Sequence, residues 1–173
     1  MTTTVRPLTP KDAEAFRAIR LESLLAHPTA FGMGYEDEAD LGIETFAARL
    51  SEPLPSSAFG GFDGEELVAI ARLRVAPNVK QRHRGTIVGV YVRPAFRRSG
   101  LSHRLIDSII QHARQHELET LLLTVAVGNH AARALYVGRG FIGYGVDKGA
   151  LKLHGTYVDE ELMALSLKAA AVS

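Results

Sequence analysis

Cysteine is absent from the 173 residues of the chain. Its absence excludes disulfide bonds, thiolate metal sites and a cysteine nucleophile. Seven histidines are present, but none belongs to a His-Glu-x-x-His motif. His112 and His116 lie four residues apart, and we expect this pair to be exposed on the polar face of a helix. We therefore predict that the protein binds no metal ion.

A strong net charge and a long apolar run are also lacking. The formal net charge is +1 at pH 7 and no dense Lys/Arg tract occurs, so we expect neither a nucleic acid nor a membrane as partner. No stretch approaches the roughly 18 apolar residues of a membrane span. Residues 1–6 have neither the charged nor the apolar region of a signal peptide. These observations favour a cytoplasmic protein.

Apolar patterning and turn signals predict one globular domain over residues 1–173, without repeats or linkers. Thr9 and Pro10 are the residue types of a helix N-cap and first helical position. We expect a mixed sheet with helices on both faces. The predicted strands are 5–8, 58–63, 66–75, 86–92, 121–127, 142–146, 151–153 and 157–167, and the predicted helices are 10–26, 44–50, one beginning at 101 and one at 129.

The run from Val90 to Ser102 contains the most specific pattern. A β-branched strand leads through Pro94 into a basic turn with one glycine, and then into a helix. Positive charge at a helix N-terminus is unfavourable without an anion, so Arg97 and Arg98 indicate an anion site, and we expect a phosphate group there. The run is neither a Walker A loop nor G-x-G-x-x-G. The helix should bury an apolar stripe made of Leu101, Leu105, Ile106, Ile109, Ile110 and Ala113.

Two signatures together resemble the GNAT superfamily of N-acetyltransferases. Arg97, Gly100 and Ser102 fill the pattern Arg/Gln-x-x-Gly-x-Gly/Ala, with serine where the family usually has glycine or alanine. About forty residues later, the run from Asn129 to Phe141 fits Asn-x-x-Ala-x-x-Leu-Tyr-x-x-x-Gly-Phe. The resemblance implies an α/β, mixed α+β fold. It would be a single domain built on a central, mostly antiparallel mixed sheet of about seven strands with helices on both faces.

The resemblance also implies acetyl-CoA as cosubstrate and a set of binding residues. The strand of Val90, Tyr91 and Val92 would splay from its parallel neighbour and bind the pantetheine arm and thioester oxygen through its backbone. Gly89 is compatible with a bulge there, although a plain buried strand is the alternative. Asn129 would contact the cofactor, cap its helix, or do both. The loop around the pyrophosphate would comprise Arg97, Arg98, Ser99, Gly100, Leu101, Ser102 and His103.

Tyr136 is the candidate general acid, because a phenol stays protonated at neutral pH and can protonate a departing thiolate. The alternative is a packing role in the core. The general base stays open. Relatives that use one often carry an acid or histidine near the start of the strand ending at Val92, where this chain has no carboxylate. A water-relayed base is an equal alternative to the candidate side chains His83, Glu36, Glu38, His154 and Glu160.

The implied function is direct transfer of an acetyl group from acetyl-CoA to a primary amine. Without cysteine, no acyl-cysteine intermediate is available. Acetylation of a protein N-terminus or lysine, and a non-catalytic acyl-CoA sensor, remain alternatives. The acidic residues within 36–40 would suit a cationic acceptor, or they form a solvated loop. The expected partners are acetyl-CoA and an amine acceptor, and a homodimer is compatible with the sequence.

Overall fold

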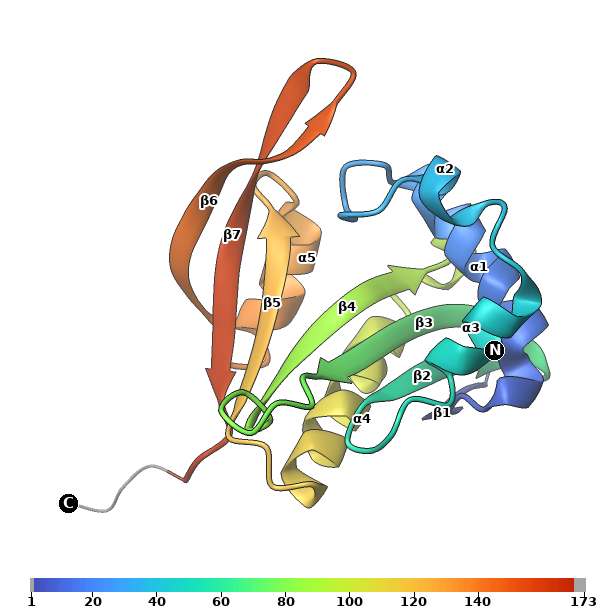
Figure 1. Cartoon of the computed structure of the whole chain (residues 1–173), viewed down its shortest axis with the longest axis horizontal. Coiled ribbons are helices and arrows are strands. Elements are labelled where there is room, and N and C mark those ends of the chain that lie inside the picture. Colours follow the sequence, from blue (N-terminus) through green and yellow to red (C-terminus); the bar gives the residue numbers. More distant parts are fainter. Residues whose placement is uncertain (1, 170–173) are drawn as a thin grey trace.

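The computed structural model describes residues 2–169 and contains one seven-stranded sheet (Figure 1). Two short 3₁₀ turns, Pro10–Asp12 and Pro94–Phe96, precede α1 and α4. The strands are β1 Thr3–Pro7, β2 Ser57–Asp63, β3 Glu66–Val75, β4 Arg84–Val92, β5 Thr120–Ala126, β6 Ile142–Leu153 and β7 Thr156–Ser166, and the helices are α1 Ala13–Ala26, α2 Tyr35–Glu38, α3 Ile43–Arg49, α4 Leu101–Gln115 and α5 His130–Val137.

The sheet order is β1-β2-β3-β4-β5-β7-β6, and only the β4–β5 pair is parallel. All other neighbours are antiparallel, which confirms the predicted mixed, mostly antiparallel sheet of seven strands. The β4–β5 connection runs through α4, as a parallel pair requires a crossover. Within residues 2–169, no helix is long and apolar enough to cross a membrane.

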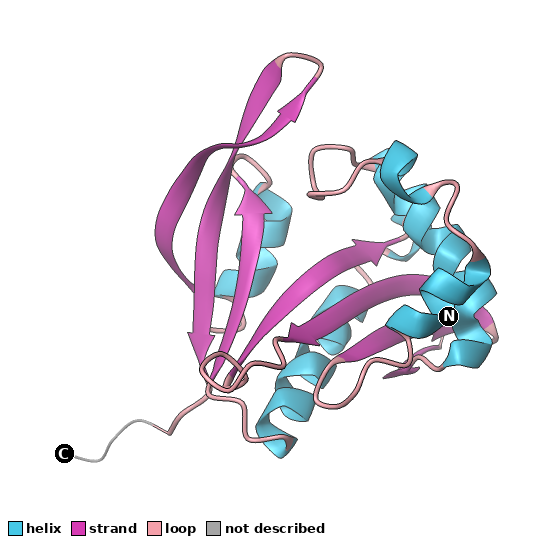
Figure 2. Cartoon of the chain, in the orientation of Figure 1, coloured by secondary structure: helices cyan, strands magenta, loops and turns pink. Residues whose placement is uncertain are grey.

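Helices cover both faces of the sheet (Figure 2). One face packs against α4, whose six predicted stripe residues are all buried. The opposite face packs against Phe16 and Ile19 of α1 and Phe46 of α3. Neighbouring residues of β4 serve opposite faces, with Tyr91 in the α1 cluster and Val92 in the α4 cluster. The apolar stripe predicted for α4 therefore packs against the sheet, and the opposite face is covered by α1 and α3.

The strands β4 and β5 diverge along their length (Figure 1). Their pairing covers only Arg84–Thr86 against Thr120–Leu122. Beyond that point, Gly89 and Val90 together oppose Ala71 of β3, which makes a bulge. Gly89 has a φ of +64°, in the left-handed region that suits glycine. The bulge turns β4 away from β5 and leaves one backbone edge without a strand partner.

Four local predictions differ from the structure. The two strands expected at 142–146 and 151–153 form one strand, β6, interrupted by register shifts after Gly143 and after Asp147. The loop 29–41 contains the short helix α2. The first helix begins with a 3₁₀ turn. His112 is partly buried, because its Nε2 lies 2.9 Å from the Pro55 carbonyl oxygen and its ring packs edge-on against a phenylalanine.

Candidate active site

A cleft of about 600 Å³ opens where β4 and β5 separate. Its walls come from both sides of the split and from the layer of α1 and α3. Among its lining residues are Val88, Gly89 and Val90 of β4, Thr124, Val125 and Ala126 of β5, Asn129, Ala132 and Tyr136 at α5, and Glu160 of β7. A cleft beside an open strand edge offers a ligand backbone hydrogen bonds as well as side chains.

Three predicted backbone-binding residues lie at and beyond the bulge. Val90 lines the cleft, whereas Tyr91 and Val92 are buried below it. The Tyr91 hydroxyl donates to Glu22 Oε1 at 2.9 Å, so its side chain holds α1 rather than a ligand. The carbonyl oxygen of Val92 accepts a hydrogen bond from Arg97 Nε at 3.1 Å. Only the backbone edge of this strand faces the split.

The loop before α4 leads into a helical turn with free backbone donors. Gly100 has a φ of +80°, and a Cβ built on it would meet no atom within 4 Å. Ser99 Oγ donates to the Phe96 carbonyl oxygen at 2.6 Å, so that hydroxyl is used within the loop. Leu101 is fully buried and can offer only its backbone. The N–H groups of Ser102 and His103 lie in the first helical turn and have no intrahelical acceptor.

The two arginines of this loop differ in their surroundings. The Arg97 guanidinium folds back onto β4 and also lies 2.7 Å from His27 Nε2. Burial first, and the nearby Arg97 charge second, lower the pKa of His27. Arg98 is exposed and makes no ion pair within residues 2–169. The sequence predicted the same anion-binding role for both arginines. In the structure, the Arg97 side chain is already held by protein groups, and the Arg98 side chain is the one available to an anion.

Asn129 and Tyr136 meet at the cleft from the two ends of α5. Asn129 Oδ1 accepts a hydrogen bond from the Ala132 N–H at 3.3 Å, which is the N-cap predicted for it. The Tyr136 ring packs edge-on against Phe141 and is 7% exposed. Burial raises the pKa of Tyr136 to about 12, so the phenol keeps its proton at neutral pH. Tyr136 thus packs in the core and also lines the cleft.

Glu160 is the candidate base that best fits the cleft. It lies opposite Ala126 in the β5–β7 register and lines the cleft that Tyr136 also lines. Burial, with a smaller contribution from the Asp147 charge, raises the pKa of Glu160. The other candidates His83, Glu36 and His154 are exposed and lie outside the lining.

Glu38 also lines the cleft, but two arginines neutralise it. Its carboxylate binds Arg20 at 2.9 Å and Arg49 at 2.8 Å, and only 2% of its side chain is exposed. Burial alone would raise the pKa of Glu38, but the hydrogen bonds from Arg20 and Arg49 outweigh it and lower the pKa. A carboxylate held in this way is a poor proton acceptor. We therefore leave Glu38 out of the catalytic set.

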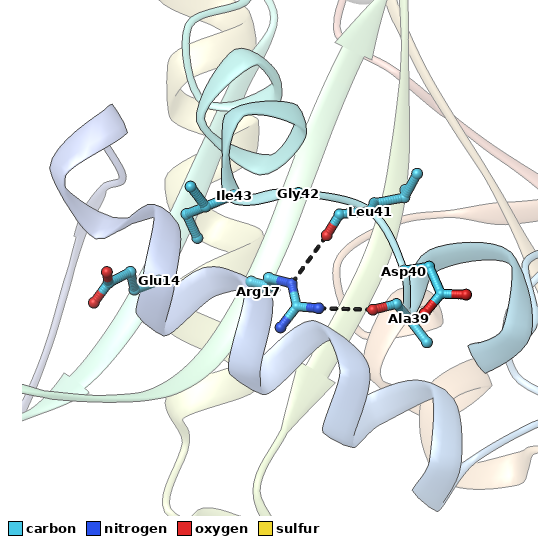
Figure 3. A pocket seen from close by; sticks show the side chains of 7 residues that line it. All are labelled: Glu14, Arg17, Ala39, Asp40, Leu41, Gly42 and Ile43. Atoms are coloured by element: carbon cyan, nitrogen blue, oxygen red, sulfur yellow. Dashed lines mark hydrogen bonds between the residues drawn. The ribbon is translucent and has the colours of Figure 1, made fainter.

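The acidic loop is structural rather than a negatively charged wall. Asp37 Oδ2 accepts a hydrogen bond from the Gly34 N–H at 2.7 Å. Figure 3 shows a second hollow beside this loop, where Arg17 donates to the carbonyl oxygens of Ala39 and Leu41. This hollow shares no lining residue with the cleft, and its arginine already donates to two backbone carbonyl oxygens. Of the acidic residues within 36–40 only Glu38 lines the cleft, whereas Glu36, Asp37 and Asp40 are exposed, which agrees with the alternative of a solvated loop.

Sequence reasoning missed the arginines of the cleft. Arg20, Arg49, Arg72 and Arg74 all line it. A signal for two of them existed in β3, where Ile70, Arg72 and Arg74 occupy alternate positions and so share one face. Two arginines following an apolar residue on the same strand face are unusual unless a polar cleft lies beside them. No such pattern marks Arg20, whose surroundings depend on the loop 29–41.

Comparison with known proteins places this geometry in context. The sequence profile described as the Acetyltransferase (GNAT) family matches residues 15–141. A search of curated proteins finds no match.

Solved structures match over nearly the whole chain. An acetyltransferase of the GNAT family from Streptococcus pneumoniae matches with a TM-score of 0.86 and 22% identity, over 96% of this chain and 100% of that one. A ribosomal-protein-alanine N-acetyltransferase from Brucella melitensis gives 0.82 and 23%, over 95% and 99%. A phosphinothricin acetyltransferase from Sinorhizobium meliloti, in complex with acetyl-CoA, gives 0.84 and 18%, over 100% and 92%. These likenesses show a shared fold.

Proposed function

The chain belongs to the GNAT family of acetyltransferases and is an acetyl-CoA-dependent N-acetyltransferase, and from this premise we propose that acetyl transfer takes place in the cleft between β4 and β5. The observation that carries the proposal is the divergence of these strands at the Gly89 bulge. It leaves a backbone edge facing the cleft that Tyr136 and Glu160 also line. The protein acts as a single domain over residues 1–173, in the cytoplasm.

The cosubstrate lies along the open edge of β4. The loop from Arg98 to His103 receives the pyrophosphate, through free N–H groups at the start of α4 and the charge of Arg98. The backbone beside Gly89 and Val90 holds the pantetheine arm and polarises the thioester carbonyl. Asn129, at the other wall, contacts the same ligand. The backbone groups among these belong to the strand β4 and to the start of α4, so they are positioned before binding, which lowers the cost of organising the site.

The chemical step follows from the groups around the bulge. The amine nitrogen attacks the thioester carbon, a C–N bond forms and the C–S bond breaks. Glu160 accepts the proton that the nitrogen loses, directly or through one water. Tyr136 donates its proton to the departing thiolate. Because burial disfavours the thiolate as it does the phenolate, the high pKa of Tyr136 does not prevent this transfer.

Two alternatives to a small-molecule acetyltransferase are kept. The ribosomal-protein-alanine N-acetyltransferase fold match makes a protein N-terminus or lysine an acceptor to test. The second alternative is a sensor that binds acyl-CoA without turnover. The intact Tyr136 and the polar lining around Glu160 support an enzyme over a sensor.

The proposal is tested by combining binding with a broad acceptor screen. Calorimetry should show acetyl-CoA binding, and detection of the released CoA thiol should identify turnover of at least one amine. The screen contains small amines, peptides with free N-termini and lysine peptides. Binding without turnover of any amine would favour the sensor, and absence of binding would overturn the proposal.

A second copy of this chain pairs with the β6–β7 hairpin. The strand β6 lies at the edge of the sheet, so one side of its backbone has no strand partner in residues 2–169. Long exposed edges are usually covered in native proteins. Four large apolar side chains are exposed on this hairpin, namely Ile142, Tyr144, Val146 and Tyr157.

A further inference from the structure

The side of the cleft lined by α1, α3 and β3, here called the acceptor side, carries more positive charge than its own carboxylates neutralise. Arg20, Arg49, Arg72 and Arg74 line it, and two carboxylates, those of Glu38 and Glu52, pair with them. Glu38 is shared by Arg20 and Arg49, and Glu52 pairs with Arg72 at 2.9 Å. Arg74 has no ion-pair partner in the described residues. With Glu160 included, four guanidinium groups and three carboxylates line the cleft, which leaves room for an anion.

Arg20 has one nitrogen that no protein group satisfies. Its Nε and Nη2 donate to Glu38, while Nη1 is buried and has no hydrogen-bond partner within residues 2–169. Phe31 packs over the guanidinium with 5.1 Å between the ring centroid and Cζ. A buried donor without an acceptor is costly. An oxyanion in the cleft would supply that acceptor.

The unsatisfied nitrogen lies next to the proposed point of transfer. A Cβ built on Gly89 would sit 3.7 Å from Arg20 Nη1, so the guanidinium reaches from α1 to the β4 bulge. An anion bound by Nη1 is consequently close to the thioester that the bulge is proposed to hold. The distance between the acceptor's anionic group and its reacting nitrogen must then be only a few bonds.

The surroundings of Arg72, on the β3 side, agree with this excess of positive charge. Burial lowers the pKa of Arg72, and the neighbouring charges of Arg49 and Arg74 lower it further, while Glu52 opposes them. The surroundings of Arg72 thus disfavour the positive charge of its guanidinium group. A second anion between Arg72 and Arg74 would relieve this repulsion.

We infer that the acceptor is a small amine that carries a carboxylate, or a comparable oxyanion, within a few bonds of its nitrogen, as an α-amino acid does. The carboxylate binds Arg20 Nη1, and Arg74 and Arg72 contact the outer part of the molecule. This inference rests on the proposed function of the cleft. A protein N-terminus has a neutral amide in place of that carboxylate. Its carbonyl oxygen can accept a hydrogen bond from Arg20 Nη1 but does not neutralise the excess positive charge, so the charge balance disfavours a protein acceptor.

Matched substrate pairs test the inference. Each α-amino acid is compared with its own α-carboxamide, and kcat/KM is measured by release of the CoA thiol. Working at a pH high enough to deprotonate both amines keeps the nucleophiles comparable. A hydrogen-bonded charge pair at Arg20 should favour the acid by about 10- to 100-fold. Preference for the carboxamides, or no turnover of any carboxylate-bearing amine, would overturn the inference.

Variants identify the arginines responsible. Arg20→Gln should lose about 10- to 100-fold in kcat/KM for the acid, mostly through KM, and should change little for the carboxamide. Because Arg20 also neutralises the buried Glu38, Arg74→Gln is the second variant. Arg74 is exposed and unpaired among residues 2–169, so its removal leaves the fold intact, and a several-fold loss for the acid is expected.

Arg114→Gln is the matched control, since Arg114 is exposed on α4 outside the cleft lining. It should keep the wild-type ratio of acid to carboxamide. Unchanged ratios in both Arg20→Gln and Arg74→Gln would overturn the inference. Calorimetry with acetyl-CoA separates the proposed function from the proposed acceptor class. If the wild type does not bind acetyl-CoA, the proposed function is refuted. If it binds acetyl-CoA but shows no preference for the acids over the carboxamides, only the acceptor class is refuted.

Discussion

Tyr136 both packs in the core and lines the cleft. Its ring is buried against Phe141, and its pKa is raised to about 12, yet it lines the cleft. The sequence signature predicted its place because the spacing within α5 fixes which face it occupies. Arg20 could not be predicted in this way. Its partners Glu38 and Phe31 come from a loop whose conformation follows from tertiary contacts rather than from periodicity.

Tyr136→Phe should lower kcat by about 100-fold, the scale of one general acid, because the leaving thiolate loses its proton donor. Acetyl-CoA binding should change little, since the ring and its packing are kept. Steady-state kinetics and calorimetry on the same preparation measure both. Turnover at the wild-type rate would reduce Tyr136 to a packing residue.

Glu160→Gln should lower kcat by about 100-fold through loss of the proton acceptor. The raised pKa of Glu160 means that its carboxylate becomes protonated at a higher pH than an ordinary carboxyl group. The wild-type rate should therefore fall as the pH drops through that raised pKa, and this fall should be absent in the variant.

Glu36→Gln is the control for this pH profile, because Glu36 is exposed and lies outside the cleft. It should keep the wild-type rate and the wild-type fall at low pH. An acidic limb that survives unchanged in Glu160→Gln would assign the base to another group.

At the scale of elements, the helix and strands with a buried face were predicted well, and the long edge strand β6 was not. The stripe of α4 and the strands β2, β3 and β4 lie close to their predicted positions because buried faces fix the register. β6 was predicted as two pieces, 142–146 and 151–153, with a gap between them where the structure has a register shift between Asp147 and Leu151. In the structure, long pairing with β7 carries the strand across this gap. Pairing between distant segments cannot be read from a local pattern.

Gly100→Ala tests the anion-binding loop before α4. The added methyl group would enter the open space beside Gly100, where the pyrophosphate is expected. We predict that the affinity for acetyl-CoA, measured by calorimetry, falls about tenfold or more, because close approach of the phosphate is blocked.

Gly155→Ala is the matched control for backbone strain. Gly155 has a φ of +82°, close to the +80° of Gly100, and it too has no atom within 4 Å of a built Cβ. It lies in the β6–β7 turn, away from α4. Equal loss of affinity in both variants would mean that strain, rather than contact with the phosphate, causes the effect.

At the scale of the whole molecule, one split in the sheet organises the site. The β4–β5 divergence brings together residues from α1, β3, β4, β5, α5 and β7. The order of these elements could be predicted from the sequence, and the two signatures predicted the fold through the family resemblance. The charge of the acceptor side could not, because it arises where α1 and β3 face the split from positions far apart in the chain.

The β6–β7 hairpin predicts a homodimer. Light scattering should give about twice the 18.8 kDa of one chain, and Tyr144→Lys should shift the mass toward the monomer because it places a charge on the edge strand. Val79→Lys, at an equally exposed apolar side chain in the β3–β4 connection, should leave the mass unchanged. A wild-type mass of one chain would contradict the dimer.

The central claim is that the acetyl group passes directly from acetyl-CoA to an amine held in the same cleft. The most direct measurement is a grid of initial rates over acetyl-CoA and acceptor concentrations, joined to the intact mass of the protein after incubation with acetyl-CoA alone. Direct transfer requires both substrates to be bound together, so the double-reciprocal lines should intersect and the protein mass should not change. Parallel lines with a stable gain of one acetyl group would contradict the account and would require a nucleophile other than cysteine.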